Sequence, residues 1–254
     1  MKSPRRSLRR LGVCVVLAVL ASVSPSRAAE RVDLELVLLA DASGSIDDSE
    51  IFFQRQGYAE AITDPDILAA IGLGQDGKIA VTYVEWGNAS SQEVVVPWTI
   101  IDGEASAAAF AKQLLEVPRL AFGRNAIGAA IAAGLALIEG NDIEGDRKII
   151  DFSGDSANNW GGIPIEVARQ AALASDVSIN GLAILCRVCA TGRPVSYDLE
   201  AAFERDIIAG PAAFVVTADG EESFASAVRR KLLLEVAGVP DEQTFRLRLA
   251  ARRP

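Results

Sequence analysis

The chain of 254 residues carries 34 acidic and 25 basic side chains, a formal net charge of −9 at pH 7, and no histidine. Without histidine, Ser-His-Asp and Cys-His catalysis, histidine-ligated zinc hydrolysis and histidine phosphotransfer all lose their central group. The acidic balance argues against a nucleic-acid or anionic-membrane surface and favours cations as partners.

Residues 1–29 have the layout of an export signal: a basic stretch, an apolar segment at 11–21, and small residues at Ala28 and Ala29. The apolar segment is shorter than the ~20 residues that a membrane span needs, so we expect a cleaved signal and no membrane span in the mature chain. Removing six basic residues and no acidic one moves the formal charge from −9 to about −15. The mature protein is therefore expected to be periplasmic or secreted, and the export route, general or twin-arginine, stays open.

The rest of the chain alternates apolar runs with longer amphipathic stretches, which is typical of a parallel sheet covered by helices. The predicted strands are 32–40, 78–86, 93–98, 147–153, 177–185 and 212–218. The predicted helices are 47–62, 104–115, 125–138, 163–174, 198–207 and 221–236, and the Ala-rich third helix is expected to pack closely on the sheet. No Pro/Ser/Gly-rich linker divides the chain, so we predict one α/β domain over 30–240 and a basic tail at 241–254.

Only the second and third strands are joined by a short turn, at 87–91, which makes the third an antiparallel edge strand where Pro97 is tolerated. Right-handed crossovers then favour a doubly wound sheet in the order 3-2-1-4-5-6. In this order the first and fourth strands are neighbours, and ligands of such sheets bind at the carboxyl ends where the winding reverses. The loop carrying Asp41, Ser43 and Ser45 should therefore face the loop carrying Asp155.

Two other motifs are better explained by structure than by chemistry. Residues 72–78, GLGQDGK, match nucleotide-binding patterns on paper, but the stretch precedes a strand instead of following one, so a glycine-rich helix stop is the preferred interpretation. Cys186 and Cys189 follow an apolar run and are expected to form a local disulfide in an oxidising compartment. A redox pair is the alternative, and a four-ligand zinc site lacks partners.

The segment DASGS places Asp41, Ser43 and Ser45 at alternate positions of an extended chain, so a carboxylate and two hydroxyls can converge on one point. Hard oxygen ligands with open positions for water describe a magnesium-type site. The alternative is a serine-rich turn that caps the helix starting near Asp47. Asp151 lies inside the fourth strand and is not a candidate.

DASGS after the first strand, FGRNAIGAAI before a helix and SGDS after the fourth strand resemble the von Willebrand factor type A (VWA) domain and its metal-ion-dependent adhesion site (MIDAS). Details such as VEWGNAS and DFSGDSANN look like an exported bacterial branch of unknown function, DUF1194. The resemblance implies a three-layer α/β/α, Rossmann-like fold over 30–240. It also implies a Mg²⁺ site, or one for Mn²⁺ or Ca²⁺, with Asp41, Ser43, Ser45 and Asp155 as ligands.

The resemblance places Asn125 where the family's middle ligand is normally threonine. An amide oxygen can ligate these cations, but its longer side chain shifts the geometry, and Arg124 beside it repels a cation. Glu85, at the carboxyl end of the second strand, is a candidate for tuning the rim of the site, with an ordinary edge residue as the alternative.

The resemblance implies an exported, non-enzymatic, adhesion-type module that binds a protein partner, which presents an acidic side chain to the metal. A scaffold of the same fold with a degenerate, metal-free site is the first alternative, because a fold does not fix a function. A magnesium-dependent phosphohydrolase with Asp41 as nucleophile is the second. Such enzymes commonly need a second carboxylate two residues on, where Ser43 stands.

Overall fold

The computed structural model describes residues 29–185, 195–219 and 221–238. Residues 1–28 of the proposed signal, both cysteines of the Cys-x-x-Cys pair and the basic tail lie outside these residues. Six strands form the main sheet, in the order β4-β3-β2-β6-β7-β8. Their bounds are β2 Leu34–Asp41, β3 Ile79–Trp86, β4 Gln92–Ile101, β6 Lys148–Gly154, β7 Ser178–Ile184 and β8 Val215–Ala218. The predicted order, with the first and fourth strands as neighbours, is confirmed.

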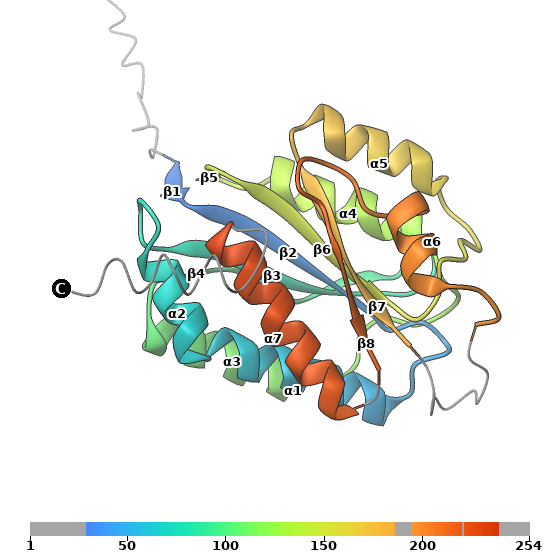
Figure 1. The fold of residues 1–254 in the computed structure, drawn as a ribbon, viewed down its shortest axis with the longest axis horizontal. Coiled ribbons are helices and arrows are strands. Elements are labelled where there is room, and N and C mark those ends of the chain that lie inside the picture. The colour runs from blue at the N-terminus through green and yellow to red at the C-terminus, as the bar shows by residue number, and fades with distance from the viewer. Residues whose placement is uncertain (1–28, 186–194, 220, 239–254) are drawn as a thin grey trace, which may run out of the picture.

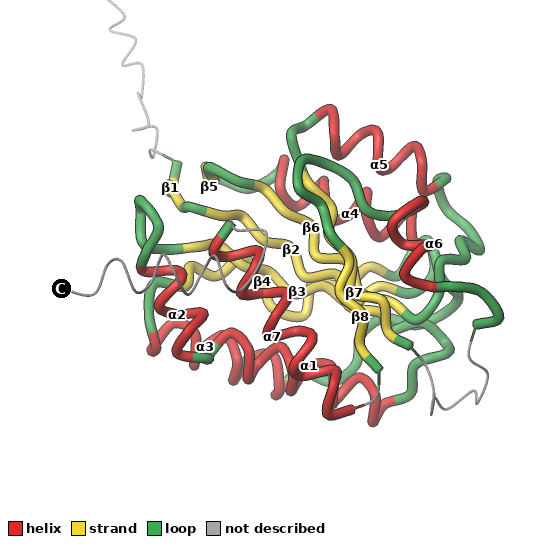
Figure 2. Tube along the Cα trace, in the orientation of Figure 1, coloured by secondary structure: helices red, strands yellow, loops and turns green. Residues whose placement is uncertain are grey.

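The strands run parallel except at one edge, where β4 pairs antiparallel with β3. Pro97 lies in this edge strand, as predicted. The sheet is the middle of three layers (Figures 1 and 2). One face is covered by α1 Asp48–Ile62, α2 Pro65–Gly72, α3 Glu104–Glu116 and α7 Glu221–Ala237, and the other by α4 Ile127–Glu139, α5 Ile165–Ala174 and α6 Leu199–Asp206.

Side chains of β2 alternate between the two cores, as the pleat of a strand requires. Leu36 and Leu38 pack with the α1 and α7 side, whereas Val37 and Leu39 pack with the α4 side. All eight residues of β2 are buried, which explains why this strand reads as an unbroken apolar run. Asp41 ends the strand with the same parity as Leu39 and therefore belongs to the α4 side of the sheet.

Helix α4 approaches the sheet closely, as its small residues predict. A Cβ on Gly134 would lie 3.2 Å from Ile150 Cδ1 and 3.4 Å from Leu39 Cδ1, so the ends of these two sheet side chains would have to shift to admit it. Among the described helices, none combines the length and apolar character needed to cross a membrane.

Three elements were not predicted from the sequence. Helix α1 ends before Thr63, and α2 begins directly afterwards because Asp64 caps its first turn and Pro65 stands at its first position. Strands β1 Glu30–Val32 and β5 Ile143–Gly145 form a separate parallel pair of three residues each. Strands this short carry too little alternation to be recognised in a sequence.

The stretch 72–78 is a helix stop, as the preferred interpretation held: α2 ends at Gly72 and β3 begins at Ile79. Its backbone amides bind a carboxylate of the protein itself. The Gln75, Asp76 and Lys78 N–H groups donate to Asp33 at 2.6, 3.0 and 3.1 Å. A Cβ on Gly74 would lie 2.1 Å from Asp33 Oδ2, so only glycine permits this approach.

Candidate metal centre

The loop after β2 folds back on its first carboxylate. The Ser43 N–H donates to Asp41 Oδ1 at 2.8 Å, and the Ser43 and Ser45 hydroxyl oxygens lie 3.2 Å apart. The Ile46 N–H donates to the Ser43 carbonyl at 3.0 Å, which closes a tight turn before α1. Asp41 and Ser43 are fully buried, whereas Gly44 is exposed and Ser45 partly exposed, so the loop reaches the protein surface.

Asp155 follows directly after β6 and meets Asp41 across the neighbouring strand ends. Gly154 makes room for this meeting, because a Cβ at that position would lie 3.3 Å from Asp41 Oδ2. Two carboxylate oxygens, Asp41 Oδ2 and Asp155 Oδ1, are buried and have no hydrogen-bond partner within the described chain. Buried acceptors are rarely left in this state, so the pair has the chemistry of a site that awaits a cation.

Both carboxyl groups have raised pKa values, and the charge of Asp155 contributes to the rise at Asp41. Burial, and then the charge of Asp155, raise the pKa of Asp41 to about 8, while hydrogen bonds from Ser43 act in the opposite direction. Burial also raises the pKa of Asp155, and a hydrogen bond with the Ser45 side chain opposes that rise. A divalent cation between two such groups would remove their repulsion and satisfy both free oxygens. The donor set therefore fits a hard divalent cation.

Asn125 lies in the loop between α3 and α4, two residues before α4 begins. It is 9% exposed, and its backbone carbonyl accepts a hydrogen bond from the Trp160 N–H at 2.7 Å. The described residues show no hydrogen bond between its side-chain amide and the other four candidate ligands. The structure thus brings Asp41, Ser43, Ser45 and Asp155 together and leaves Asn125 beside them.

One sequence interpretation placed Glu85 on the rim of the site. In the structure Glu85 is instead in the protein interior. Its side chain is fully buried and pairs with the Arg55 guanidinium, with Nη2 2.6 Å and Nε 3.0 Å from Oε1. Its other oxygen accepts the Leu120 and Ala121 N–H groups at 2.8 and 3.3 Å. Glu85 therefore fixes the loop after α3.

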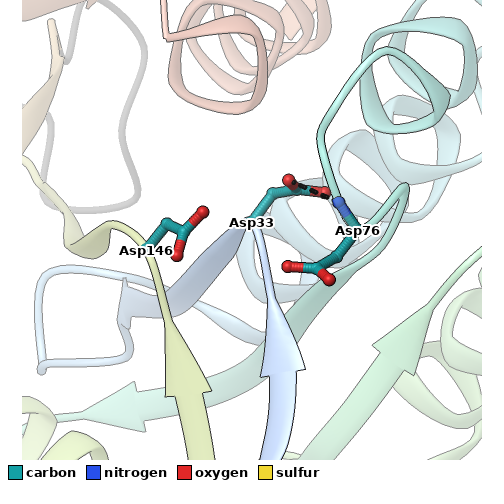
Figure 3. A group of neighbouring side chains, drawn as sticks. All are labelled: Asp33, Asp76 and Asp146. Carbon is teal, nitrogen blue, oxygen red and sulfur yellow. Dashed lines mark hydrogen bonds between the residues drawn. The ribbon is translucent and has the colours of Figure 1, made fainter.

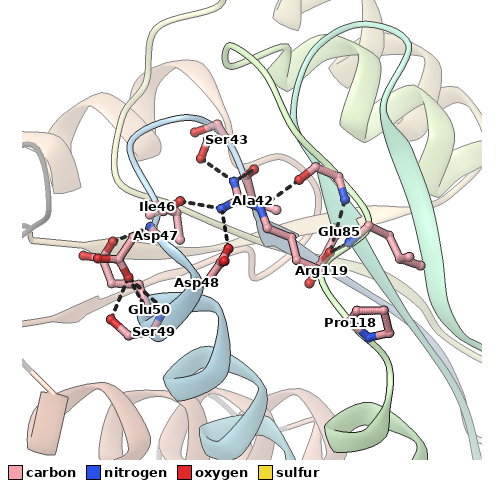
Figure 4. Close-up of polar contacts among 12 residues, drawn as sticks. Ala42, Ser43, Ile46, Asp47, Asp48, Ser49, Glu50, Glu85, Pro118 and Arg119 are labelled. Atoms are coloured by element: carbon pink, nitrogen blue, oxygen red, sulfur yellow. Dashed lines mark hydrogen bonds and ion pairs between the residues drawn. The ribbon is translucent and has the colours of Figure 1, made fainter.

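Arg119 joins that loop to the candidate ligands (Figure 4). Its guanidinium donates to the carbonyls of Ala42, Ser43 and Ile46 at 2.5, 3.1 and 2.9 Å. One side chain thus holds three carbonyls of the turn that carries the serines. Sequence reasoning missed this role, because Arg119 stands in no recognised motif and a loop arginine is usually solvated.

A second acidic group lies at the amino-terminal ends of the strands, opposite the candidate site. It consists of Asp33, Asp76 and Asp146, which precede β2, β3 and β6 (Figure 3). One oxygen from each lies within 4.8 Å of the others. Protein groups compensate part of its charge: Asp33 accepts three backbone N–H groups, and Arg31 lies 3.1 Å from Asp146 and 4.0 Å from Asp76, although Asp76 Oδ2 is itself buried without a hydrogen-bond partner among the described residues. We therefore centre the candidate site on Asp41 and Asp155.

The sheet order, the helical layers and the loop geometry define a VWA-type fold, and similar solved structures agree. Proximal thread matrix protein 1 from the mussel byssus is 17% identical, with a TM-score of 0.58 over 82% of this chain and 49% of that chain. A von Willebrand factor type A protein from Catenulispora acidiphila is 15% identical, with a TM-score of 0.56 over 81% of this chain and 43% of that one. The pilus adhesin SpaC of Lactobacillus rhamnosus GG is 14% identical, with a TM-score of 0.56 over 83% and 30%.

The chain belongs to the DUF1194 family, described as a protein of unknown function, whose model matches residues 31–240. No curated protein matches the sequence. The chain spans about half or less of the length of the three similar structures, and their low identity shows the fold alone. One structure of the mussel protein is described as having a zinc-occupied MIDAS motif.

Proposed function

We propose that this protein is an exported, metal-dependent protein-binding module whose divalent cation site is formed by Asp41, Ser43, Ser45 and Asp155. Asn125 would serve as a further ligand, directly or through water. The observation that carries the proposal is the pair of buried, unpartnered oxygens on Asp41 and Asp155. Mg²⁺ suits this set of hydroxyl and carboxylate oxygens, and Mn²⁺ and Ca²⁺ are the other candidates.

The protein ligand follows from the charge of the site. Two carboxylates and otherwise neutral hydroxyls leave a bound divalent cation able to accept a further anionic oxygen. A partner that presents an Asp or Glu side chain supplies that oxygen, so the cation would link the two proteins. The similar structures include a pilus adhesin and a thread matrix protein, which supports a binding role and not an enzymatic one.

Calorimetric titration with Mg²⁺, Mn²⁺, Ca²⁺ and Zn²⁺ tests the site. The wild type should bind at least one of these cations, and Asp41→Asn should abolish binding. Asp146→Asn is the matched control, because it removes one carboxylate from the acidic group at the opposite edge. Loss of binding in Asp146→Asn with retention in Asp41→Asn would place the metal at the amino edge and refute the proposal.

A metal-free scaffold is the rival that one observation favours, namely the Asn125 amide that makes no hydrogen bond to the other candidate ligands. Thermal unfolding with and without chelator separates the two, because a cation bound only by the native state raises stability by mass action. Identical melting temperatures with saturating Mg²⁺, Mn²⁺ or Ca²⁺ and with chelator would favour the scaffold. Hydrolysis of a generic phosphate ester that Asp41→Asn abolishes would instead indicate a phosphohydrolase.

A further inference from the structure

An arginine is stacked on an exposed aromatic ring beside the candidate metal centre. The Arg124 guanidinium carbon lies 4.7 Å from the centre of the Trp160 ring, and Trp160 is 62% exposed. The same two residues border Asn125: Arg124 precedes it, and the Trp160 backbone N–H donates to its carbonyl. The pair is therefore fixed to the rim of the site by backbone as well as by ring contact.

Arg124 carries a positive charge that no acidic side chain of the described residues pairs with. It is exposed, and no carboxylate of the described chain forms an ion pair with it. Arg119, which stacks on Phe122 at 4.7 Å, instead uses its guanidinium to hold backbone carbonyls. The loop of Arg124 is joined to the turn that carries the serines, because the Gly44 N–H donates to the Gly123 carbonyl at 2.7 Å. In a chain with a net charge of −9, an exposed arginine on this loop is a positive charge on a mostly acidic protein.

A positive charge at this place has opposite effects on the divalent cation and on the anionic partner segment of the proposed site. It repels a divalent cation, so it does not serve metal affinity. It attracts an anionic segment, and its planar guanidinium, held against a ring, is preorganised to pair with a carboxylate. Trp160 is 62% exposed, and Phe122, two residues before Arg124 in the chain, is 55% exposed, so both rings offer apolar contact.

We propose that Arg124 and Trp160 form a second recognition subsite, which selects protein segments with two carboxylates and an apolar side chain. One carboxylate would bind the metal, the second would pair with Arg124, and the apolar side chain would lie on Trp160. This inference rests on the proposed function, because the first carboxylate needs the cation. It adds what a metal alone does not give, namely a preference among acidic partners.

Blocked peptides such as acetyl-Gly-Asp-Leu-Asp-Gly-amide test the subsite. In a matched control peptide, Asn replaces the second Asp. The spacing between the two Asp residues is varied over one to three positions. The metal-loaded wild type should bind the better two-carboxylate peptide about threefold to fivefold more tightly than its Asn counterpart, the range for a partly exposed ion pair. Trp160 is the most exposed tryptophan described, so its emission should report binding beside calorimetry.

Arg124→Gln should remove the preference for the second carboxylate while leaving affinity for the one-carboxylate peptide much less affected. It should also leave binding of the metal alone unchanged or about twofold tighter, because a repelling charge is gone. Arg205→Gln is the control, since it removes the same charge from an exposed residue that pairs with Asp206 on α6. Its preference should equal that of the wild type.

The outcomes separate the two proposals. If the wild type binds no metal, the proposed function fails and the subsite fails with it. If metal binds but the peptides show no preference for two carboxylates, or bind not at all, only the subsite is refuted. If Arg124→Gln keeps the preference for two carboxylates, Arg124 is not its source. If Arg205→Gln also removes the preference, it comes from the overall charge of the protein. Either result overturns the role of Arg124.

Discussion

Asp41 and Asp155 come together because β2 and β6 are parallel neighbours, and each carboxylate keeps one buried oxygen without a hydrogen-bond partner in the described chain. In the absence of a cation this arrangement is unfavourable, since two acidic groups share a site from which water is largely excluded. The cost would be removed by neutralising either carboxylate or by binding a cation. These two routes have different consequences for stability.

Asp155→Asn should stabilise the protein in chelator and abolish stabilisation by metal. Removing one buried charge should raise the free energy of unfolding in chelator by on the order of 1 kcal/mol. The wild type should gain about 2.7 kcal/mol at a metal concentration one hundred times its dissociation constant, whereas the variant should gain nothing. Urea unfolding of both proteins, with and without Mg²⁺, measures each quantity. An Asp155→Asn variant that still responds to Mg²⁺ would remove Asp155 from the site.

The arrangement of strands could be predicted because the information is local. The four central strands β2, β3, β6 and β7 are buried and mostly apolar, the single short turn at 87–91 identifies the antiparallel pair, and handedness limits the rest. The meeting of Asp41 with Asp155 follows from that order alone. The orientation of their side chains does not, because it depends on Gly154 and on hydrogen bonds within the loops.

Arg119→Gln should weaken metal binding about tenfold, although Arg119 is not a proposed ligand. The substitution releases the carbonyls of Ala42, Ser43 and Ile46, which frees the turn that presents the two serines. Loss of charge-assisted hydrogen bonds should also lower the free energy of unfolding by about 1.5–3 kcal/mol. Calorimetry gives the affinity, and urea unfolding in chelator gives the stability.

Arg119→Lys separates the geometry of this clamp from its charge. Lysine keeps the positive charge but cannot donate to several carbonyls in the fixed plane of a guanidinium. We expect its metal affinity to resemble that of Arg119→Gln. Wild-type affinity in Arg119→Lys, at a stability that keeps the protein folded, would show that the clamp does not position the ligands.

Gly128→Ala should destabilise the protein, although Gly→Ala normally stabilises a helix. A Cβ at Gly128, in the first turn of α4, would lie 2.1 Å from the Ile163 carbonyl oxygen, so the loop between Asp155 and α5 must move. We expect a loss of about 1–3 kcal/mol and weaker metal binding. Gly72→Ala is the control: the end of α2 has open space there, and the change should gain up to about 1 kcal/mol. Equal effects of the two substitutions in urea unfolding would contradict this packing.

Sequence reasoning singled out Glu85 for the rim but missed its pairing with the buried Arg55. Glu85 and Arg55 are far apart in the chain, and each on its own resembles a solvated residue. One signal was available for Arg55, because it stands on the inward face of α1 between the buried residues Ile51 and Tyr58. A charge at such a position needs a buried partner, but the sequence does not say which residue supplies it.

A buried ionic cluster joins α7 to the sheet. Lys231 Nζ lies 2.7 Å from Asp151 Oδ1 and 2.6 Å from Glu235 Oε1, and all three side chains are buried. Asn180 on β7 also donates to Glu235 Oε1, at 2.9 Å. The cluster thus contains two carboxylates and one ammonium group. Burial, and then the charge of Asp151, raise the pKa of Glu235 to about 8, although Lys231 acts in the opposite direction.

The stability of the protein should therefore fall as pH rises from about 4.5 to about 8. Over this range the folded state keeps the Glu235 proton while the unfolded chain, with the ordinary glutamate pKa, releases it. Glu235→Gln should flatten this dependence, because glutamine is neutral at every pH and its amide oxygen can still accept from Asn180. Urea unfolding at several pH values measures the slope. Carrying both proteins in an Asp41→Asn, Asp155→Asn background with chelator removes the contributions of the two other carboxyl groups whose pKa is raised. An unchanged slope in Glu235→Gln would show that α7 is not held through a protonated glutamate.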